Sequence, residues 1–326
     1  MGIRHLNRFF KENASSAIKQ LNLSELSGKK FAIDISIYMY KYASDNALIE
    51  NIYLMLSTFK HYNIIPIFIF DGRPPAEKDD LLRKRREDKK NAENEYNNMK
   101  QLLENNANMD DVERREIISN MDVLKKQFIY ISKIDVEMVK QLISAYGATY
   151  YDAVGEADEL CALLTIKGKV WGCLSEDMDM FVYGCPRVFR YLSLFKHTVI
   201  LYDTKVILET LGITQKNLRE ICILSGTDYN TEADFKNGTH TLYDNFKYFK
   251  KYQKDKSTLD FTEWLYNQPN YTIDNEALLR INDIFELNNI PCNIKFDKLK
   301  ISNGAVDKKT LDDILKNEGF ILPITL

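Results

Sequence analysis

Cysteine and histidine are scarce in this 326-residue chain and never clustered. The five cysteines lie far apart, without a single C-x-x-C pair, a pattern typical of reduced intracellular thiols rather than of a disulfide framework or a zinc site. The four histidines are equally dispersed, which argues against a zinc hydrolase. We therefore expect an intracellular protein, nuclear or cytoplasmic, whose chemistry uses other side chains.

Long apolar runs are also absent. No stretch approaches the roughly 18 apolar residues that a membrane span needs, and the first residues contain no apolar signal core. Gly2 is followed at the sixth position by Leu6 rather than by Ser or Thr, so N-myristoylation is not expected. The net charge is only −3, so any basic surface for nucleic acid must be local. We expect no membrane association.

What the sequence does contain is a series of short runs rich in β-branched and aromatic residues, separated by helical patterns such as those at 51–62 and 135–146. Short apolar strands that alternate with helices favour an α/β fold with a mainly parallel central sheet flanked by helices. The predicted strands cover 30–35, 64–71, 147–153 and 169–175.

A segment without Gly or Pro, residues 76–131, interrupts this alternation. Most of 76–98 is charged or polar, and 83–90 (RKRREDKK) has six basic residues against two acidic ones. Taken alone, this cluster is better explained by a solvated helix face than by a nucleic-acid contact. An apolar stripe at helical spacing follows, so we expect a long, poorly buried helical excursion that returns to the core through a packed helix. The stripe consists of Ile117, Met121, Leu124, Phe128 and Ile131.

Several predicted strands run directly into an acidic residue. KKFAID ends in Asp34, IIPIFIFD ends in Asp71, and Asp177 and Asp179 follow KVWGCL. Each alone is explained by a turn or a helix N-cap. Ligands of open parallel sheets bind outside the carboxyl ends of the strands, so these acids are expected to meet on one patch.

A further pair, Glu156 and Asp158, opens the helix after the third strand. On a regular helix the two side chains would diverge by about 200°, so both reach one site only at a frayed first turn. Carboxylates gathered in this way repel one another unless cations neutralise them. Oxygen ligands without His or Cys favour Mg²⁺ or Mn²⁺, and two such ions form a familiar site for attack on a phosphodiester.

Six motifs, in order and at similar spacing, carry a resemblance to a known family. MGIRHL, FAIDISIYMY, IFIFDGRPP, YYDAVGEADE, LSEDMDMFVYG and ILSGTDY resemble the motifs of the flap endonuclease group of the XPG nuclease family. The resemblance covers nearly the whole chain. It implies a PIN-like 5′ nuclease core with a helical arch insertion and a helical C-terminal region.

The resemblance also implies roles for individual residues. Lys78 and Arg85 match the arch residues that approach the scissile phosphate, and Tyr40 matches an aromatic residue that stacks on a base. The amine of Gly2 matches a buried terminal contact with the active site, and Lys84 and Arg86 belong to the basic cluster that would contact DNA. Two Mg²⁺ ions, replaceable by Mn²⁺, would be bound by Asp34, Asp71, Glu156, Asp158, Asp177, Asp179 and Asp228.

Four departures limit the resemblance. Asp158 stands where flap endonucleases usually have Glu, and its shorter side chain would favour contact with metal through water. The linker near Asp45–Glu50 is shorter than the family's, so we assign neither a duplex-opening wedge nor a 3′ flap pocket. The Gly-Ile-Gly hairpin that binds potassium in the family is replaced by NTEADFKNGTHTLYDNF after Asp228, so potassium is not assigned. The final residues, ILPITL, show no clamp-binding box and no basic tail.

The resemblance implies a Mg²⁺-dependent, structure-specific 5′ nuclease that hydrolyses DNA phosphodiesters at 5′ flaps, nicks, gaps or ends, in replication, repair or recombination. We expect a monomer, with replication or recombination proteins as possible partners. An RNA-degrading nuclease of the same fold and a catalytically inactive nucleic-acid-binding scaffold remain alternatives. The expected partition is an N-terminal nuclease region (1–104), an internal nuclease region (105–235) and a helical C-terminal region for duplex binding (236–326), together forming one nuclease unit.

Overall fold

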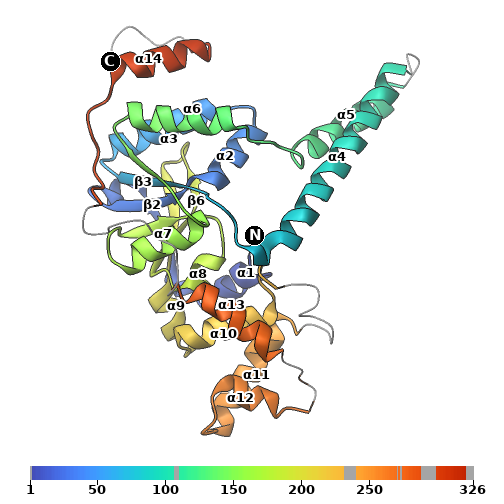
Figure 1. Ribbon diagram of the computed structural model, residues 1–326, viewed down its shortest axis with the longest axis vertical. Coiled ribbons are helices and arrows are strands. Elements are labelled where there is room, and N and C mark those ends of the chain that lie inside the picture. The colour runs from blue at the N-terminus through green and yellow to red at the C-terminus, as the bar shows by residue number, and fades with distance from the viewer. Residues whose placement is uncertain are drawn as a thin grey trace.

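A seven-stranded mixed sheet lies at the centre of the described part of the chain (Figure 1). Its strand order is β1-β7-β6-β5-β2-β3-β4; the strands from β6 to β4 are parallel, whereas β7 is antiparallel to both β6 and β1. The strands are β1 (Ile18–Asn22), β2 (Lys30–Asp34), β3 (Ile65–Phe70), β4 (Thr149–Asp152), β5 (Gly172–Leu174), β6 (Arg187–Ser193) and β7 (Thr198–Asp203). The computed structural model describes residues 2–105, 110–230, 240–269, 271, 274–287 and 299–320.

The mainly parallel α/β sheet expected from the sequence is confirmed. Side chains of the central strands alternate between two hydrophobic clusters, one on each face: Phe31, Ile33 and Phe68 on one side, Ala32 and Ile67 on the other. Both faces are covered, which is why these strands read as continuous apolar runs in the sequence. The sequence did not predict β1, β6 and β7, which extend the sheet at one edge.

Helices cover both faces of the sheet in two layers (Figure 1). One layer consists of α2 (Ile35–Ser44), α3 (Leu48–His61), α6 (Lys133–Ala145) and α14 (Lys308–Asn317). The other contains α1 (Leu6–Asn13), α7 (Ala157–Ile166), α8 (Asp179–Tyr183), α9 (Thr204–Leu211), α10 (Gln215–Ser225), α11 (Leu242–Asp255), α12 (Phe261–Tyr266) and α13 (Asn275–Phe285). No helix in the described ranges is both long enough and apolar enough to cross a membrane.

The predicted partition of the chain at 104/105 and 235/236 stays a prediction. Both α13 and α14 belong to its last part, yet they pack in opposite layers. The segment before α14 reaches its layer along the edge of the sheet, where the Gly304 N–H donates to the Gly147 carbonyl and the Asn303 side chain donates to the Ile64 carbonyl.

Two long helices, α4 (Asp79–Asn105) and α5 (Asp111–Lys125), project from the body as an arm (Figure 1). They pack against each other, with Ala92 on α4 and Leu124 on α5 buried. Beside this contact, the rings of Tyr96 and Phe128 meet edge to face, with centroids 5.4 Å apart. The helical excursion predicted from residues 76–131 is therefore present.

The partner of its apolar stripe differs from the expectation. The stripe that includes Leu124 and Phe128 packs against α4 instead of leading a helix back to the core, and only Ile131 joins a core cluster. The helix that does pack on the core after the arm is α6, which begins at Lys133. Helical periodicity identified the apolar face correctly, but it carries no information about which element covers that face.

Candidate active site

Seven acidic side chains are delivered to the carboxyl edge of the sheet by neighbouring elements. Asp34 is the last residue of β2 and Asp71 follows β3, which pairs directly with β2. Asp177 and Asp179 follow β5, the neighbour of β2 on its other side. The remaining three lie at the start of α7 and after α10: Glu156, Asp158 and Asp228.

Burial and the repulsion of neighbouring charges act on three of these carboxyl groups: Asp34, Asp158 and Asp179. Asp34, Asp177 and Asp179 are only 4%, 7% and 2% exposed. Burial raises the pKa of Asp34 well above its usual value, and the negative charges of Asp71 and Asp177 raise it further. Burial likewise raises the pKa values of Asp158, near Asp34 and Asp177, and of Asp179, near Asp177 and Asp228. The site therefore favours bound positive charge.

Hydrogen bonds hold one side of several carboxylates. Asp34 Oδ1 accepts from the Ser36 N–H at 3.1 Å, as the N-cap of α2, and Asp71 Oδ1 accepts from the Ala157 N–H at 2.9 Å. These contacts confirm that Asp34 caps a helix without excluding a second role, because a carboxylate has several acceptor positions.

The fully buried Ser175, which the sequence analysis missed, lies among the acids. Its Oγ is 3.4 Å from Asp34 Oδ2 and 3.5 Å from Asp158 Oδ1, and it accepts from the Asp177 N–H at 3.1 Å. The Asp179 N–H in turn donates to Asp177 Oδ1 at 3.0 Å. Ser175 therefore links three of the predicted segments, and its only sequence signal is its place directly before EDMD.

Glu156 and Asp158 reach the same site because Glu156 lies outside the regular helix. It occupies the N-cap position of α7 with an extended backbone, φ −80° and ψ 149°, while Asp158 lies in the first turn. The divergence of about 200° expected for two side chains two positions apart on a regular helix therefore does not apply to Glu156 and Asp158.

Lys78 lies over the acidic site from the base of the arm. Its ammonium group is 2.7 Å from Glu156 Oε2 and 4.5 Å from the centroid of the Tyr229 ring. Burial alone would lower the pKa of Lys78, but the charge and hydrogen bond of Glu156 outweigh it and raise the pKa. Tyr229, another residue that the sequence analysis missed, donates to Glu156 Oε2 at 2.7 Å, and its hydroxyl lies 2.6 Å from that of Tyr183.

Arg85, two turns into α4, makes the second contact between the arm and the acids. Its guanidinium donates to Asp228 Oδ2 at 2.8 Å. Lys84 and Arg86, on either side of it, are exposed. Of these three consecutive basic residues, Arg85 therefore faces the acids, whereas Lys84 and Arg86 face solvent.

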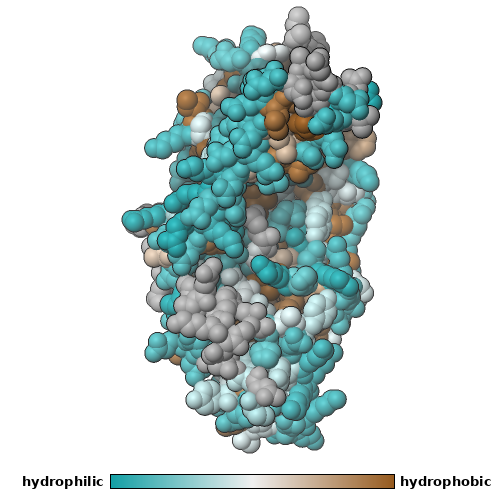
Figure 2. All heavy atoms as spheres, turned by 90° about the vertical axis from the view of Figure 1, so that its right-hand side faces the viewer, coloured by the Kyte–Doolittle hydropathy of each residue, from teal (hydrophilic) through white to brown (hydrophobic). Residues whose placement is uncertain are grey.

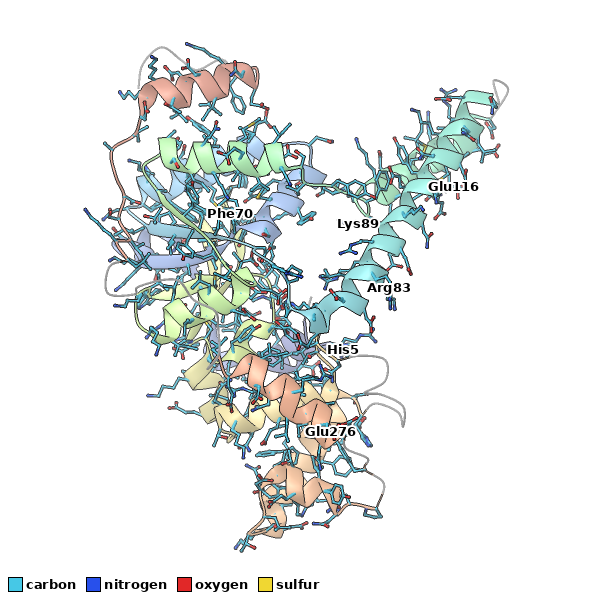
Figure 3. The ribbon with its side chains drawn as sticks, in the orientation of Figure 1. His5, Phe70, Arg83, Lys89, Glu116 and Glu276 are labelled. Carbon is cyan, nitrogen blue, oxygen red and sulfur yellow. The ribbon has the colours of Figure 1, made fainter. Side chains whose placement is uncertain are left out.

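Tyr40 lies on α2 at the foot of the arm and is 45% exposed. Burial and the nearby Asp71 raise the pKa of its hydroxyl. The ammonium group of Lys89 lies 4.7 Å from the Tyr40 ring centroid and donates to the Ile129 carbonyl at 2.8 Å. Lys89, which lies further along the arm than Arg83 (Figure 3), thus joins α2, α4 and the chain after α5, a role that the sequence did not single out.

Gly2 lies directly against two of the acids. A Cβ atom at this position would be 2.5 Å from Asp177 Oδ1 and 2.5 Å from Asp179 Oδ1, and the backbone has a φ of 75°, which favours glycine. The structure therefore brings residue 2 to the acidic site, as the resemblance implied, and leaves no space there for a side chain.

The donor set fits hard divalent cations, although no group of three or more His, Cys, Asp or Glu in the described residues is already arranged as a metal site. The donors are carboxylate oxygens, which Mg²⁺ and Mn²⁺ prefer. Asp179 Oδ1 is buried and has no hydrogen-bond partner in the described structure. A cation beside this oxygen would compensate for its burial.

The linker between α2 and α3 consists of Asp45, Asn46 and Ala47. Residues 231–239, which include most of the segment in place of the family's hairpin, and the final residues 321–326 lie outside the described part of the chain.

Comparison with known proteins agrees with this architecture. The catalytic core of Rad2 in complex with DNA substrate has the same fold, with a TM-score of 0.66 at 20% identity over 98% of this chain and 96% of that chain. The Holliday junction-resolving enzyme GEN1, with product DNA and Mg²⁺, has a TM-score of 0.62 at 18% identity over 94% of this chain and 72% of that chain. The molecule therefore has the 5′ nuclease fold.

The sequence matches are more specific. Residues 1–92 match the XPG N-terminal domain and residues 147–228 match the XPG I-region. Together these regions cover more than half of the chain, and the chain belongs to the XPG family.

Individual proteins named flap endonuclease 1 also match this chain, and two of them show the extent of the similarity. The protein from Lodderomyces elongisporus is 30% identical over 248 residues, covering 70% of this chain and 61% of the relative. The protein from Cryptosporidium parvum is 30% identical over 294 residues, covering 79% and 56%. This chain thus spans about six tenths of the length of these relatives.

Proposed function

We propose that this protein is a Mg²⁺-dependent, structure-specific 5′ nuclease that hydrolyses DNA phosphodiesters at flaps, nicks, gaps or free 5′ ends. The observation that carries the proposal is the meeting of opposite charges at one place. Buried and half-buried carboxylates crowd the edge of the sheet. Lys78, directly before the arm, and Arg85, on the arm, each form an ion pair with one of them. A phosphodiester between these groups would face metal-binding acids on one side and cationic donors on the other.

The seven carboxylates would hold two Mg²⁺ ions, directly or through water, with Mn²⁺ able to replace them. Bound there, the ions would activate the attacking water and stabilise the leaving 3′ oxygen. The protein's own residues hold the carboxylates in place through Ser175, the Ser36 N–H and the Ala157 N–H. Lys78 and Arg85 would leave Glu156 and Asp228 to stabilise charge on the phosphate.

Binding of DNA would use several surfaces around this centre. Tyr40 exposes part of its ring at the foot of the arm for stacking on a base. The exposed Lys84 and Arg86 extend the positive charge along α4. On α11, exposed lysines recur at helical spacing and offer a row of contacts for duplex phosphates: Lys247, Lys250, Lys251 and Lys254. Cleavage of such substrates would serve replication, repair or recombination.

The test is a cleavage assay with fluorescently labelled flap, gap, nick and hairpin DNA at millimolar Mg²⁺, with EDTA as the metal-free control. A matched RNA flap measures the preference between DNA and RNA. We expect cleavage of DNA with a free 5′ strand, with 5′-phosphate on the products. Metal-independent cleavage, or no cleavage of any substrate by folded protein that binds the DNA, would contradict the proposal.

A further inference from the structure

Glu176 stands next to the metal-binding candidates in sequence but faces a different partner. Its Oε1 accepts from the Tyr191 N–H at 2.6 Å, and its Oε2 is 3.5 Å from Arg190 Nε, as an ion pair rather than a hydrogen bond. Both partners lie on β6, behind the acidic edge. Glu176 is thus an anchor of the chain between β5 and α8 and is absent from the set of converging acids.

Arg190 holds the same stretch of chain on both sides of Asp177. Its guanidinium donates to the Glu176 carbonyl at 2.8 Å and contacts Met178 Sδ at 2.8 Å. Arg190 is only 6% exposed, and a planar guanidinium offers fixed donor directions that a lysine ammonium lacks. One buried side chain therefore fixes the residue before Asp177 and the residue after it.

The backbone around Arg190 is shaped for these contacts. The pairing of β6 with β7 shifts register between Arg190 and Ser193, and Tyr191 has a φ of 56°, which residues other than glycine seldom adopt. This bulge directs the Tyr191 N–H to Glu176. Bulges of this kind recur beside active sites, where they aim a side chain.

The bulge also connects to the N-terminal helix. Asn7 of α1 donates from its amide to the Tyr191 hydroxyl at 2.7 Å and accepts from the Tyr202 hydroxyl at 2.8 Å. The Arg190 guanidinium carbon lies 4.8 Å from the centroid of the Tyr191 ring. The β6 bulge thus contacts both chain segments that meet at Asp177 and Asp179, namely residues 176–178 and the helix that follows Gly2.

We propose that Arg190 is a positioning residue for the metal centre: it fixes the chain from Glu176 to Met178 so that Asp177 and Asp179 present their carboxylates to bound cations. The inference rests on the proposed metal-dependent function, but it concerns a residue that touches neither substrate nor metal. The competing explanation is that Arg190 only stabilises the fold. The two differ in whether metal affinity changes in a folded variant.

The measurement is Mn²⁺ binding to the DNA-free protein, followed by electron paramagnetic resonance of the free ion. Loss of a residue that orients metal ligands typically weakens metal affinity about 10–100-fold, and we expect this for Arg190→Met. The matched control is Arg187→Met on the same strand. Arg187 donates to the Trp171 carbonyl at 3.3 Å, away from residues 176–179, so Mn²⁺ affinity should be unchanged.

Two further variants separate positioning from folding. Arg190→Lys keeps the positive charge beside Glu176 but lacks the planar guanidinium with its fixed donor directions. This variant should therefore bind Mn²⁺ with an affinity between those of wild type and Arg190→Met. In the double variant Glu176→Gln/Arg190→Met, the partly buried ion pair is removed as a whole. Its melting temperature should recover toward wild type while its Mn²⁺ affinity stays low.

The Mg²⁺ dependence of cleavage gives a second readout. Arg190→Lys should need more Mg²⁺ than wild type for half-maximal cleavage, by a smaller factor than the about 10–100-fold expected for Arg190→Met, and should regain most of the wild-type rate when Mg²⁺ is saturating. If folded Arg190→Met and Arg190→Lys bind Mn²⁺ as wild type does, the positioning role is overturned while the proposed function stands. If wild type itself neither binds Mn²⁺ nor cleaves DNA, the proposed function is contradicted, and the inference about Arg190 is contradicted as a consequence.

Discussion

At the carboxyl edge of the sheet, three of the seven acids are buried, three are half-buried and Asp71 is exposed, whereas on the arm most charged side chains face solvent. Asp34 and Asp71 each accept from a main-chain N–H of a neighbouring helix. Along the 27 residues of α4, all of them described, only Ala92 is buried. The space-filling view of this side shows the arm as a largely hydrophilic ridge (Figure 2). The acidic residues of the site are therefore positioned by the core, whereas the basic residues lie on or beside the projecting arm.

Among the described residues, few side-chain contacts join the acidic edge of the sheet to the arm. Lys78 and Arg85 make ion pairs with the acids, and Lys89 bridges to Tyr40. An arm attached in this way can change its position without disturbing the sheet. In the proposed function, metal binding would depend on the packing of the core that holds the acids. Capture of the substrate would depend instead on a few exchangeable contacts between the arm and the body.

The largest expected contrast is in hydrogen exchange. Amides of β2 and β5 should exchange at least about 10³-fold more slowly than those of α4 between residues 83 and 98, because core amides open only with global unfolding. Exchange followed by mass spectrometry, with and without flap DNA, measures this. Slow exchange throughout 83–98 in the free protein, unchanged by DNA, would contradict a separately mobile arm.

Removal of a carboxylate should abolish catalysis. We expect Asp177→Asn and Asp179→Asn each to lower the cleavage rate by about 10³-fold or more, since each removes charge from a buried metal site, while DNA affinity changes little. Single-turnover kinetics and fluorescence anisotropy provide the two readouts. Wild-type turnover by either variant at millimolar Mg²⁺ would remove that residue from the metal site.

Removal of the arm's two inner cations should have a smaller effect on rate. For Lys78→Ala and Arg85→Ala we expect single-turnover cleavage to fall about 10²–10³-fold, the usual cost of removing a charge-stabilising donor, with a much smaller change in DNA affinity. Lys84→Ala serves as the matched control, since Lys84 precedes Arg85 and is exposed. A rise in the dissociation constant alone would make both residues binding contacts only.

The smallest effect should come from the outward-facing cations. Charge-neutralising Lys84 and Arg86 together should reduce the salt dependence of flap DNA binding, and the slope should change by about 1 for each phosphate that is no longer neutralised. Binding measured from low to moderate salt gives this slope, and a nicked duplex without a flap is the control. An unchanged slope on flap DNA would make this face of α4 a solvated surface only.

Sequence reasoning placed the acids well because its signal there is local. A buried strand that ends in Asp34 or Asp71 can be read directly, and neighbouring parallel strands put both at one edge. Residues whose contribution depends on contacts distant in sequence escaped detection. Tyr229 meets Glu156, and Ser175 meets Asp34, across 73 and 141 positions of the chain.

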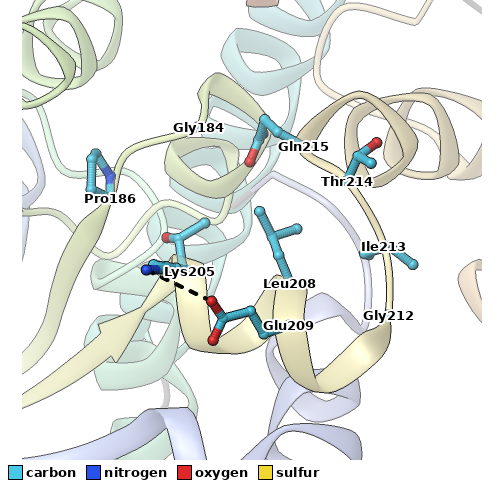
Figure 4. Close-up of a pocket in the computed structure, with 10 residues that line it drawn as sticks. Gly184, Pro186, Lys205, Leu208, Glu209, Gly212, Ile213, Thr214 and Gln215 are labelled. Atoms are coloured by element: carbon cyan, nitrogen blue, oxygen red, sulfur yellow. Dashed lines mark ion pairs between the residues drawn. The ribbon is translucent and has the colours of Figure 1, made fainter.

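Two further differences have the same cause. β6 and β7 pair across a bulge at Arg190, and a bulge interrupts the regular alternation by which strands are predicted. The charge pattern of the six basic residues at 83–90 does not distinguish Arg85 from Arg86; the family resemblance singled out Arg85, and the fold places it against Asp228 while Arg86 faces solvent. The close-up in Figure 4 makes the same point for Leu208 and Ile213, which line an open surface pocket of about 540 Å³ next to Gly184. No local motif in the sequence indicated this pocket.

The segment that carries α14 along the edge of the sheet has a consequence for biosynthesis. Asn303 bonds to Ile64 across 239 positions of the chain, and α14 buries Leu311 and Leu315 in the layer of α3 and α6. Until the ribosome has translated the codons for α14, that layer lacks its outer cover and its apolar side chains face water or a chaperone. Late closure of this kind favours slow completion of folding. A chain released before residue 299 should therefore bind apolar dyes and aggregate, even though every candidate metal ligand is already present.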